Sequence, residues 1–380
     1  MPANETTVLD DTTLRLPEML SDLQRLVETE SPSGDHAAVA ASAAVVAELV
    51  EQRLGRTPEM LVENGCTHVR LRFGAPRVLL LAHHDTVWPL GSLAAQPFSI
   101  VDGVIRGPGC FDMKVGLVQA IHAMATLRDR GGDEALDGIE LLVTGDEELG
   151  SPDSRELIEA DAAGCSAALV LEASGDGGAL KIGRKGVAVY RLDITGRAAH
   201  AGLEPELGVN AGVELAHQIL RISGFGRSAL GTTVTPTAAG VGTTSNTVPA
   251  AAHLLVDSRA TSLDEQSRVD AEMHALTPVL AGALVTVDGA PNRPPMDHEH
   301  TGPVFARALR LAGEHDLGPL TGIDVGGGSD GNFTAGIGVP TLDGLGAVGG
   351  GAHAADEHAL VDSIAPRTAL LVHLVADLLP

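Results

Sequence analysis

The sequence predicts an α/β protein in which a mixed sheet is flanked by helices and a second, α+β unit is inserted into the first. Apolar runs at residues 78–82, 139–143 and 167–171 indicate buried strands, and helix-period segments alternate with them. The pattern changes after residue 183 and returns after residue 296. Aromatic residues make up only 2% of the 380 residues, so the core must consist of Ala, Val, Leu and Ile. A chain of this length usually divides into two domains.

The first unit is predicted to be discontinuous, with residues 1–183 and 296–380 folding together. Its expected helices cover residues 14–30, 35–54, about 113–128, 303–313 and 364–379, and a further strand is expected near residues 338–342. The inserted unit, residues 184–295, has the order strand, helix, strand, strand, helix, strand, at residues 186–196, 209–223, 232–238, 252–258, 263–276 and 284–288. That order is the ferredoxin-like or split βαβ arrangement.

Charge and cysteine content limit the function classes. The chain has 25 basic and 50 acidic residues, a formal net charge of -25, which repels nucleic acid and anionic membrane surfaces. Its three cysteines lack the short spacings of a thiolate metal site or a disulfide framework, so a reducing compartment is expected. The first residues do not have the pattern of a secretory leader, and no segment has the ~18 apolar residues of a membrane span. We therefore expect a cytoplasmic protein without nucleic-acid or membrane partners.

Acidic and histidine side chains follow the predicted buried strands. Parallel strands bring their carboxyl ends to one edge of a sheet, so side chains that follow them meet there. Several buried carboxylates together need compensation, and metal ions provide it. The candidates for such a site are His83, Asp112, Glu147, Glu148, Glu172 and His353.

Imidazole and carboxylate ligands suit Zn²⁺ best and also admit Co²⁺ or Mn²⁺. We expect one ion to bind His83 and Glu172, the other to bind Glu148 and His353, and Asp112 to be shared. Three protein ligands per ion leave room for a bridging water, whose pKa falls toward neutrality between two Zn²⁺ ions. The sequence thus predicts a hydrolytic site with two metal ions.

Two further residues complete this prediction. Glu147 is the candidate general base for the water, and Asp85, two residues after His83, would orient that histidine. Taken singly, these motifs have plainer explanations. A His-x-Asp pair can end a strand, Asp112 can cap a helix, and adjacent glutamates are common on surfaces.

Two other functions stay open from the residues. The segment GGSDG at 327–331 matches G-x-S-x-G, and Ser329, Asp343 and His353 follow in the order of an α/β-hydrolase triad. This serine hydrolase leaves the acidic cluster unexplained, and residues 322–328 are too rich in glycine for the strand that must precede the serine. A non-catalytic dimeric binding protein is the second alternative, which the complete ligand set disfavours. The glycine-rich runs lack the Lys-Ser/Thr of a phosphate loop, so nucleotide binding is not expected.

A set of short motifs runs through nearly the whole chain: AHHDTV, GPGCFDMK, TGDEELGS, LVLEAS, AAHAGLEPELGVNA, SNTVPA, NRPP, GGGSD and AHAADE. This set resembles the cocatalytic zinc aminoacylase and carboxypeptidase family, most closely its bacterial glutamate carboxypeptidase branch. The resemblance implies a zinc-peptidase-like catalytic domain with two Zn²⁺ per subunit and the ligand roles given above. It implies hydrolysis of an amide or peptide bond next to a free α-carboxylate, in an N-acyl amino acid or a dipeptide. It also implies a homodimer, with the inserted unit as its dimerisation domain.

The same resemblance assigns residues that composition cannot. His200 matches a histidine that reaches the partner subunit's active site and stabilises the oxyanion. Asn246 and Arg293 match groups that hold the substrate carboxylate, a task that suits a bidentate arginine, and Arg259 matches a further basic position. The turn at Gly328 is expected beside the substrate. Without the family, His200 would be a strand-end histidine, Asn246 a turn former and Arg293 a surface charge.

The chain departs from the family pattern at two positions. Val115 replaces the first glycine of Asp-Met-Lys-Gly-Gly, next to Asp112. The lysine that reads a glutamate side chain in that branch falls near Ala179, with Lys181 and Arg184 as neighbours, so preference for glutamate does not follow. The family also implies a cis peptide bond between Asp112 and Met113.

Overall fold

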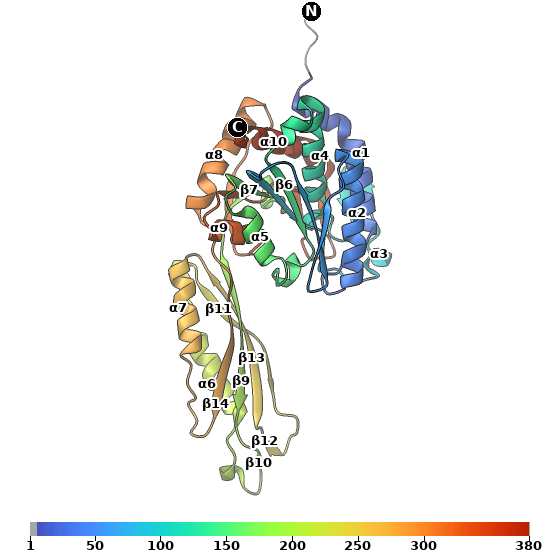
Figure 1. The fold of residues 1–380 in the computed structure, drawn as a ribbon. Helices are drawn as coiled ribbons and strands as arrows, with labels where there is room; N and C mark the ends of the chain where they lie inside the picture. Colours follow the sequence, from blue (N-terminus) through green and yellow to red (C-terminus); the bar gives the residue numbers. More distant parts are fainter. Residues whose placement is uncertain (1–5, 380) are drawn as a thin grey trace, which may run out of the picture. The chain divides into compact units, whose positions relative to one another are not determined.

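The computed structural model describes residues 6–379, and the chain divides into two compact units (Figure 1). The first comprises the described residues up to Gly183, Asp297–Val325 and the described residues from Ser329 onward. The second comprises Arg184–Met296 and the glycine segment Gly326–Gly328. The inserted unit was predicted to end at residue 295, and it ends one residue later, at Met296. The grouping of Gly326–Gly328 with this unit was not predicted.

A six-stranded mixed sheet forms the centre of the first unit. Its order is β1 (Glu59–Glu63), β2 (Cys66–Arg72), β6 (Ile139–Thr144), β3 (Val78–His83), β7 (Ala167–Val170) and β16 (Thr341–Leu342). Strands β6, β3, β7 and β16 are parallel, whereas β1 and β2 add an antiparallel edge. Strands β3, β6 and β7 are buried along their whole length, which explains why they are almost entirely apolar before their last residues, with Glu140 of β6 as the exception. The predicted fold class is confirmed.

Helices cover both faces of this sheet because successive side chains of a strand point to opposite sides (Figure 1). Leu80 and Leu141 belong to the core with helices α1 (Val8–Glu28), α2 (His36–Leu54), α4 (Val115–Gly131), α8 (His298–Glu314) and α10 (Val361–Leu378). Leu79 and Leu142 belong to the core with α5 (Arg155–Ala162) and α9 (Gly331–Gly336).

Two helices begin before their predicted starts because polar residues cap them. The Thr7 hydroxyl and the Asp10 carboxylate form a reciprocal capping box that starts α1, six residues before the predicted start. The Asp297 carboxylate accepts the backbone N–H groups of Glu299 and His300 and starts α8. Both helices contain a proline, Pro17 in α1 and Pro303 in α8.

Short strands that were not predicted connect the loops of the first unit. Strands β17 (Gly349–Gly350), β18 (His358–Leu360), β5 (Val104–Arg106) and β4 (Ser99–Val101) form an antiparallel sheet. Strand β15 (Gly322–Val325) pairs with β8 (Leu180–Arg184). The short helix α3 (Ser92–Ala95) precedes β4. The predicted strand at 338–342 shrinks to the two residues of β16.

The second unit is a four-stranded antiparallel sheet with two helices on one face. Its elements are β9 (Gly186–Thr195), α6 (Ala211–Ile222), β11 (Thr233–Val241), β13 (Ala251–Ala260), α7 (Leu263–His274) and β14 (Leu284–Arg293). The sheet order is β11-β13-β9-β14, and alternate residues such as Tyr190, Leu192 and Val256 form the core beneath the helices. The predicted βαββαβ order is therefore present. A two-residue ladder of β10 (Ala199–His200) and β12 (Thr247–Val248) extends one end of the unit (Figure 1).

All three cysteines are buried and free. Burial raises the pKa of Cys66 to about 12 and that of Cys165 to about 11, so these thiols are poor nucleophiles near neutral pH. Among the described residues, none of the helices combines the length and the apolar character that crossing a bilayer requires.

Candidate metal centre

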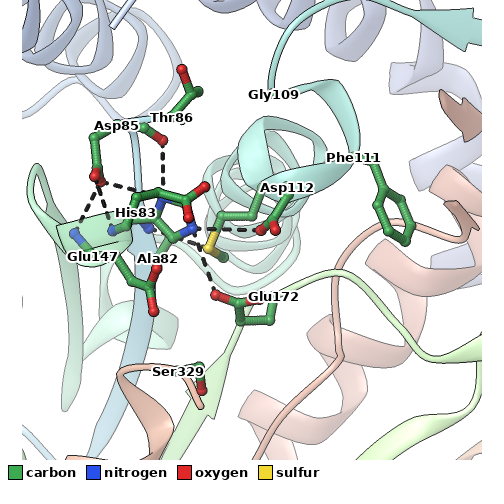
Figure 2. A network of polar contacts seen from close by, with 12 residues as sticks. Ala82, His83, Asp85, Thr86, Gly109, Phe111, Asp112, Glu147, Glu172 and Ser329 are labelled. Atoms are coloured by element: carbon green, nitrogen blue, oxygen red, sulfur yellow. Dashed lines mark hydrogen bonds and ion pairs between the residues drawn. The ribbon is translucent and has the colours of Figure 1, made fainter. Parts of the chain in front are cut away.

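The ends of three neighbouring strands deliver most of the candidate ligands to one place (Figure 2). His83 is the last residue of β3, Glu147 and Glu148 form the turn after β6, and Glu172 lies two residues after the end of β7. Because these strands are parallel, their carboxyl ends lie at the same edge of the sheet.

Two loops supply the remaining candidates. Asp112 lies in the turn Cys110–Lys114, directly before α4. His353 lies between β17 and β18, with a left-handed backbone at φ 60°. These loops are held together by the ladder of β18 with β5, since β5 precedes the Asp112 turn.

The two oxygens of Asp112 face two different histidines. Asp112 Oδ1 lies 3.6 Å from His83 Nε2, which is 3.5 Å from Glu172 Oε1. Asp112 Oδ2 lies 3.4 Å from His353 Nε2, which is 3.1 Å from Glu148 Oε2. The five side chains thus form two half-sites that share one carboxylate.

Asp85 contacts both the His83 ring and the backbone of the Glu147 turn, and it thereby holds these parts of the cluster in place (Figure 2). Its carboxylate accepts the backbone N–H groups of Glu147 and Glu148, both at 3.2 Å, and the hydroxyl of Ser33. His83 Nδ1 lies 3.0 Å from the Asp85 carbonyl oxygen and 3.4 Å from its Oδ1. The ring therefore points Nε2 toward the carboxylates, as an imidazole ligand requires. His84 turns away, and its Nε2 contacts the carbonyl oxygen of Thr67.

The donor atoms fit bound cations. Within residues 6–379, His83 Nε2, Asp112 Oδ1 and Glu148 Oε1 are buried without a hydrogen-bond partner, which is costly unless another group occupies the space between them. Burial opposes the charge of Asp112, yet His353 and His83 outweigh it and lower its pKa. Asp112 and Glu148 raise the pKa of His353 to about 10. The cluster has an excess of negative charge that attracts positive charge, and divalent ions supply it.

Glu147 is buried within the same group of residues. Ligand atoms of His83, Glu147 and Glu172 lie within 4.8 Å of one another, as do those of His83, Asp112 and Glu148. Glu147 is 8% exposed. Its carboxylate thus lies in the cluster with His83 and Glu172 rather than in solvent.

Glu357 is a residue of this site that sequence reasoning missed. Its carboxylate accepts the backbone N–H groups of Gly109 at 3.0 Å, Phe111 at 2.9 Å and Asp112 at 3.2 Å. It also accepts the indole N–H of Trp88 at 2.6 Å. Glu357 follows His353 by four residues, so it connects the two loops that carry ligands. The only signal was an acid in the motif AHAADE, which looks like an ordinary surface residue.

The turn at Asp112 contains the expected cis peptide bond between Asp112 and Met113, and this prediction is confirmed. The structure also explains the departure at Val115. A Cβ at Gly116 would lie 1.9 Å from the carbonyl oxygen of Leu171, so only glycine fits there. Val115 points into the core instead and is 1% exposed. The valine that stands in place of the family's glycine at residue 115 is therefore accommodated in the hydrophobic core.

The structure contradicts the serine hydrolase alternative. Ser329 is fully buried, and its hydroxyl donates to Asp343 at 2.6 Å instead of meeting a histidine. His353 contacts Asp112 and Glu148, so it is engaged elsewhere. The expectation that residues 322–328 form no strand is wrong in part, because residues 322–325 form β15. That strand is exposed and is separated from Ser329 by three glycines.

In the second unit, the structure places His200 and Asn246 together at one end of the sheet. His200 pairs with Thr247 in the β10–β12 ladder, and the Asn246 carbonyl accepts the N–H of Ala201 at 2.9 Å. His200 is exposed, and its Nδ1 accepts the N–H groups of Gly202 and Leu203, both at 3.1 Å. The proton of a neutral ring therefore sits on Nε2, which faces away as a hydrogen-bond donor.

Arg293, Arg259 and Gly328 lie at the other end of that unit. Arg293 and Arg259 both align with Val187 near the start of β9, and Arg293 is 6% exposed. Arg293 is thus not the surface charge of the plainer explanation. Arg259 is engaged by Asp257, with contacts of 2.7 and 2.9 Å.

Sequence reasoning assigned Arg184 no role beyond its proximity to Ala179, but in the structure its side chain binds the backbone of the glycine turn at residues 327–328. Its guanidinium donates to the carbonyl oxygens of Gly327 and Gly328, both at 3.2 Å. Ala179 is buried, and Lys181 Nζ lies 3.8 Å from Glu172 Oε2.

Comparisons with known proteins show the family to which the chain belongs. The family model described as peptidase family M20/M25/M40 matches residues 79–377. Carboxypeptidase G2 of Pseudomonas sp. is 32% identical over 376 residues, which cover 95% of this chain and 89% of that protein. A succinyl-diaminopimelate desuccinylase of Azoarcus sp. is 28% identical, over 87% of this chain and 92% of that protein. A family M20 metallo-carboxypeptidase from Sulfolobus solfataricus has the same fold, with a TM-score of 0.76 at 18% identity, covering 94% and 98% of the two chains. The chain therefore belongs to the M20/M25/M40 family of metallopeptidases.

Proposed function

We propose that this protein hydrolyses an amide or peptide bond next to a free α-carboxylate and uses two Zn²⁺ ions per subunit. The observation that carries the proposal is the shared carboxylate, since the two oxygens of Asp112 face separate histidine and glutamate pairs. His83 and Glu172 would hold one ion, and Glu148 and His353 would hold the other. Imidazole and carboxylate oxygen suit Zn²⁺, and Co²⁺ or Mn²⁺ fit the same ligands.

The bound ions would supply positive charge that acidifies a water and polarises the scissile carbonyl. Glu147 would accept the proton of the attacking water and later donate it to the leaving amine, because its carboxylate is buried beside His83 and Glu172. Asp85 would keep His83 in one orientation through its contacts with that ring and with the Glu147 turn. His200 would donate from Nε2 to the carbonyl oxygen as negative charge develops there.

The substrate class is an N-acyl amino acid or a dipeptide. The relatives named above are a carboxypeptidase and a succinyl-diaminopimelate desuccinylase, and these names support this class. Arg293 and Asn246 are the groups proposed to hold that carboxylate, and Arg259 and Gly328 are proposed to lie nearby. Arg293 offers two parallel N–H donors, which match a carboxylate.

The positions of these residues in the second unit support a homodimer. Arg293 aligns with Val187, whereas β9 continues to Thr195 before the chain reaches His200. Eight residues of strand span about 26 Å. One small substrate cannot reach both His200 and Arg293 of the same chain. If both act on it, His200 and its neighbour Asn246 come from a second copy, and residues 184–295 form the dimerisation domain.

The first test measures the metal content and the activity of one variant. In Glu147→Ala, hydrolysis of a panel of N-acyl amino acids and dipeptides should fall at least ~1,000-fold, while elemental analysis still finds two zinc ions per chain. Glu156→Ala, an exposed acid on α5, is the matched control and should behave as wild type. Loss of one zinc from Glu147→Ala would show that Glu147 is a ligand. Full activity after removal of all metal would overturn the proposal.

A mixing experiment tests the second copy. His200→Ala and Glu147→Ala should each be inactive alone, and mixed dimers should regain activity at the sites that receive His200 from the other chain. Wild-type subunits mixed with Glu147→Ala give the reference for subunit exchange. No rescue after demonstrated exchange would contradict a shared site.

A further inference from the structure

On the second turn of α10, in the first unit, lies a buried arginine that has no acidic partner among residues 6–379. Arg367 is 6% exposed, and its guanidinium donates to the carbonyl oxygen of Gly178. Its second terminal nitrogen, Nη1, is buried without a hydrogen-bond partner among the described residues. Asp176 and Asp362 neighbour this region in sequence, yet neither forms an ion pair with Arg367. The guanidinium of Arg367, which stays protonated in proteins, is thus buried beside the neutral carbonyl group of Gly178.

This arginine lines a cavity of about 190 Å³. Most of the other side chains in its wall are apolar, namely Leu317 and Leu320 after α8, Val348 before β17, and Leu370 on α10, and the backbone of Gly177 and Gly178 completes the wall. Ser363 lies at the same cavity, but its hydroxyl already donates to the Leu360 carbonyl oxygen at 2.7 Å. The cavity therefore offers one guanidinium group beside several apolar side chains.

An uncompensated buried guanidinium destabilises the fold, and an anion that enters the cavity would offset that cost. Arginine binds carboxylates through two parallel hydrogen bonds. Phosphate and sulfate are strongly hydrated on all sides, so apolar walls disfavour them. A carboxylate with an apolar body satisfies the guanidinium with one end and the walls with the other.

We propose that this cavity binds one small carboxylate with an apolar body, paired with Arg367. Binding would contact the segments that carry two of the candidate metal ligands. Gly178 follows Glu172 in the chain, Val348 precedes His353, and the N–H of Ser174 donates to the Ala347 carbonyl oxygen at 2.8 Å. The site is nevertheless separate from the proposed catalysis, and its test does not depend on turnover.

The test is calorimetric titration of the zinc-loaded, full-length protein with benzoate, and with sulfate in parallel. The variant Arg367→Met keeps an unbranched apolar stem that reaches about as far as Nε, and it removes the guanidinium and its charge. Ser363→Trp keeps the arginine and narrows the cavity. A benzoate bound at the metal centre would persist in both variants, so the difference from wild type isolates this site.

We expect wild type to bind one benzoate per chain that both variants lose, with affinity reduced at least ~10-fold and with weaker sulfate binding. Arg367→Met should melt no lower than wild type in carboxylate-free buffer, because it removes an uncompensated charge. Unchanged benzoate binding in Arg367→Met, or no binding to wild type, would overturn the proposal. Equal binding of sulfate would refute the apolar carboxylate, and a strongly destabilised Arg367→Met would show that the arginine serves the fold alone.

Discussion

Replacing Glu357 with glutamine should lower both the free energy of unfolding and the affinity for zinc. The carboxylate accepts four N–H donors, three from the backbone between Gly109 and Asp112 and one from Trp88. A glutamine has one acceptor oxygen with two lone pairs, and its NH₂ group would face N–H donors. About two of the four donors therefore lose their acceptor.

A hydrogen bond to a charged group contributes about 1.5–3 kcal/mol, so the loss of two bonds predicts a drop of about 3 kcal/mol or more in the free energy of unfolding. Residues that orient metal ligands typically change metal affinity by about 10–100-fold when they are replaced. We expect Glu357→Gln to lose zinc within that range. If it does, kcat should fall more than KM changes, because the substrate-binding residues proposed above lie elsewhere.

Urea unfolding and zinc competition with a chromophoric chelator measure these effects. Glu134→Gln, an exposed acid in the turn before β6, is the matched control and should behave as wild type. Glu357→Asp keeps the charge and should recover part of the zinc affinity. If Glu357→Gln unfolds and binds zinc as wild type does, the four hydrogen bonds do not position Asp112 and the reasoning is wrong.

Three further changes test the scaffold. Gly116→Ala should displace the Asp112 turn and reduce zinc affinity at least ~10-fold, because its Cβ would lie 1.9 Å from the Leu171 carbonyl oxygen; normal zinc content would show that the turn adapts. Asp22→Ala should lower the free energy of unfolding by about 3 kcal/mol in urea titrations, since its buried carboxylate binds Arg53 twice at 2.8 Å and His122 at 2.8 Å. Burial and Asp161 raise the pKa of Glu140 to about 8, so its contribution to stability is complete below pH 4.5 and is lost as pH rises toward 8. Glu140→Gln should therefore unfold at higher urea concentration than wild type at pH 9 and not at pH 4.5, and equal midpoints at pH 9 would contradict this.

Most of the fold follows from the sequence because the core strands are buried on both faces. Such strands have few polar positions, so 78–82, 139–143 and 167–171 stand out as apolar runs in which Glu140 is the one polar residue. The short strands β17 and β18 give no such signal, since two or three residues have no period. The antiparallel edge strand β1 is also exposed, which removes the apolar pattern.

The candidate ligands were predictable because they follow those strands or belong to recognised motifs. Glu357 was not predictable in this way, since its partners are backbone N–H groups about 245 residues earlier in the chain. The contact exists only because β18 pairs with β5. The surroundings of Arg367 were not predictable either. A helical pattern places this residue on a buried face, but it does not show whether an acidic side chain lies next to it. Sequence patterns thus identify side chains that act at strand ends, and they miss those whose partners are backbone atoms of distant loops.

The two halves of the metal centre are held with unequal rigidity, which leads to a last prediction. The His83 side chain is 1% exposed and that of Glu172 is 8% exposed, and both sit at the ends of buried strands. The His353 side chain is 51% exposed and lies on a loop between two-residue and three-residue strands. A ligand on a loop loses more conformational freedom on binding, so the ion held by His353 and Glu148 should dissociate first. Zinc release to excess chelator should show two phases of equal amplitude, and Glu357→Gln should accelerate the faster phase much more than the slower one. A single phase that releases both ions would mean that Asp112 couples the half-sites so tightly that neither exists alone.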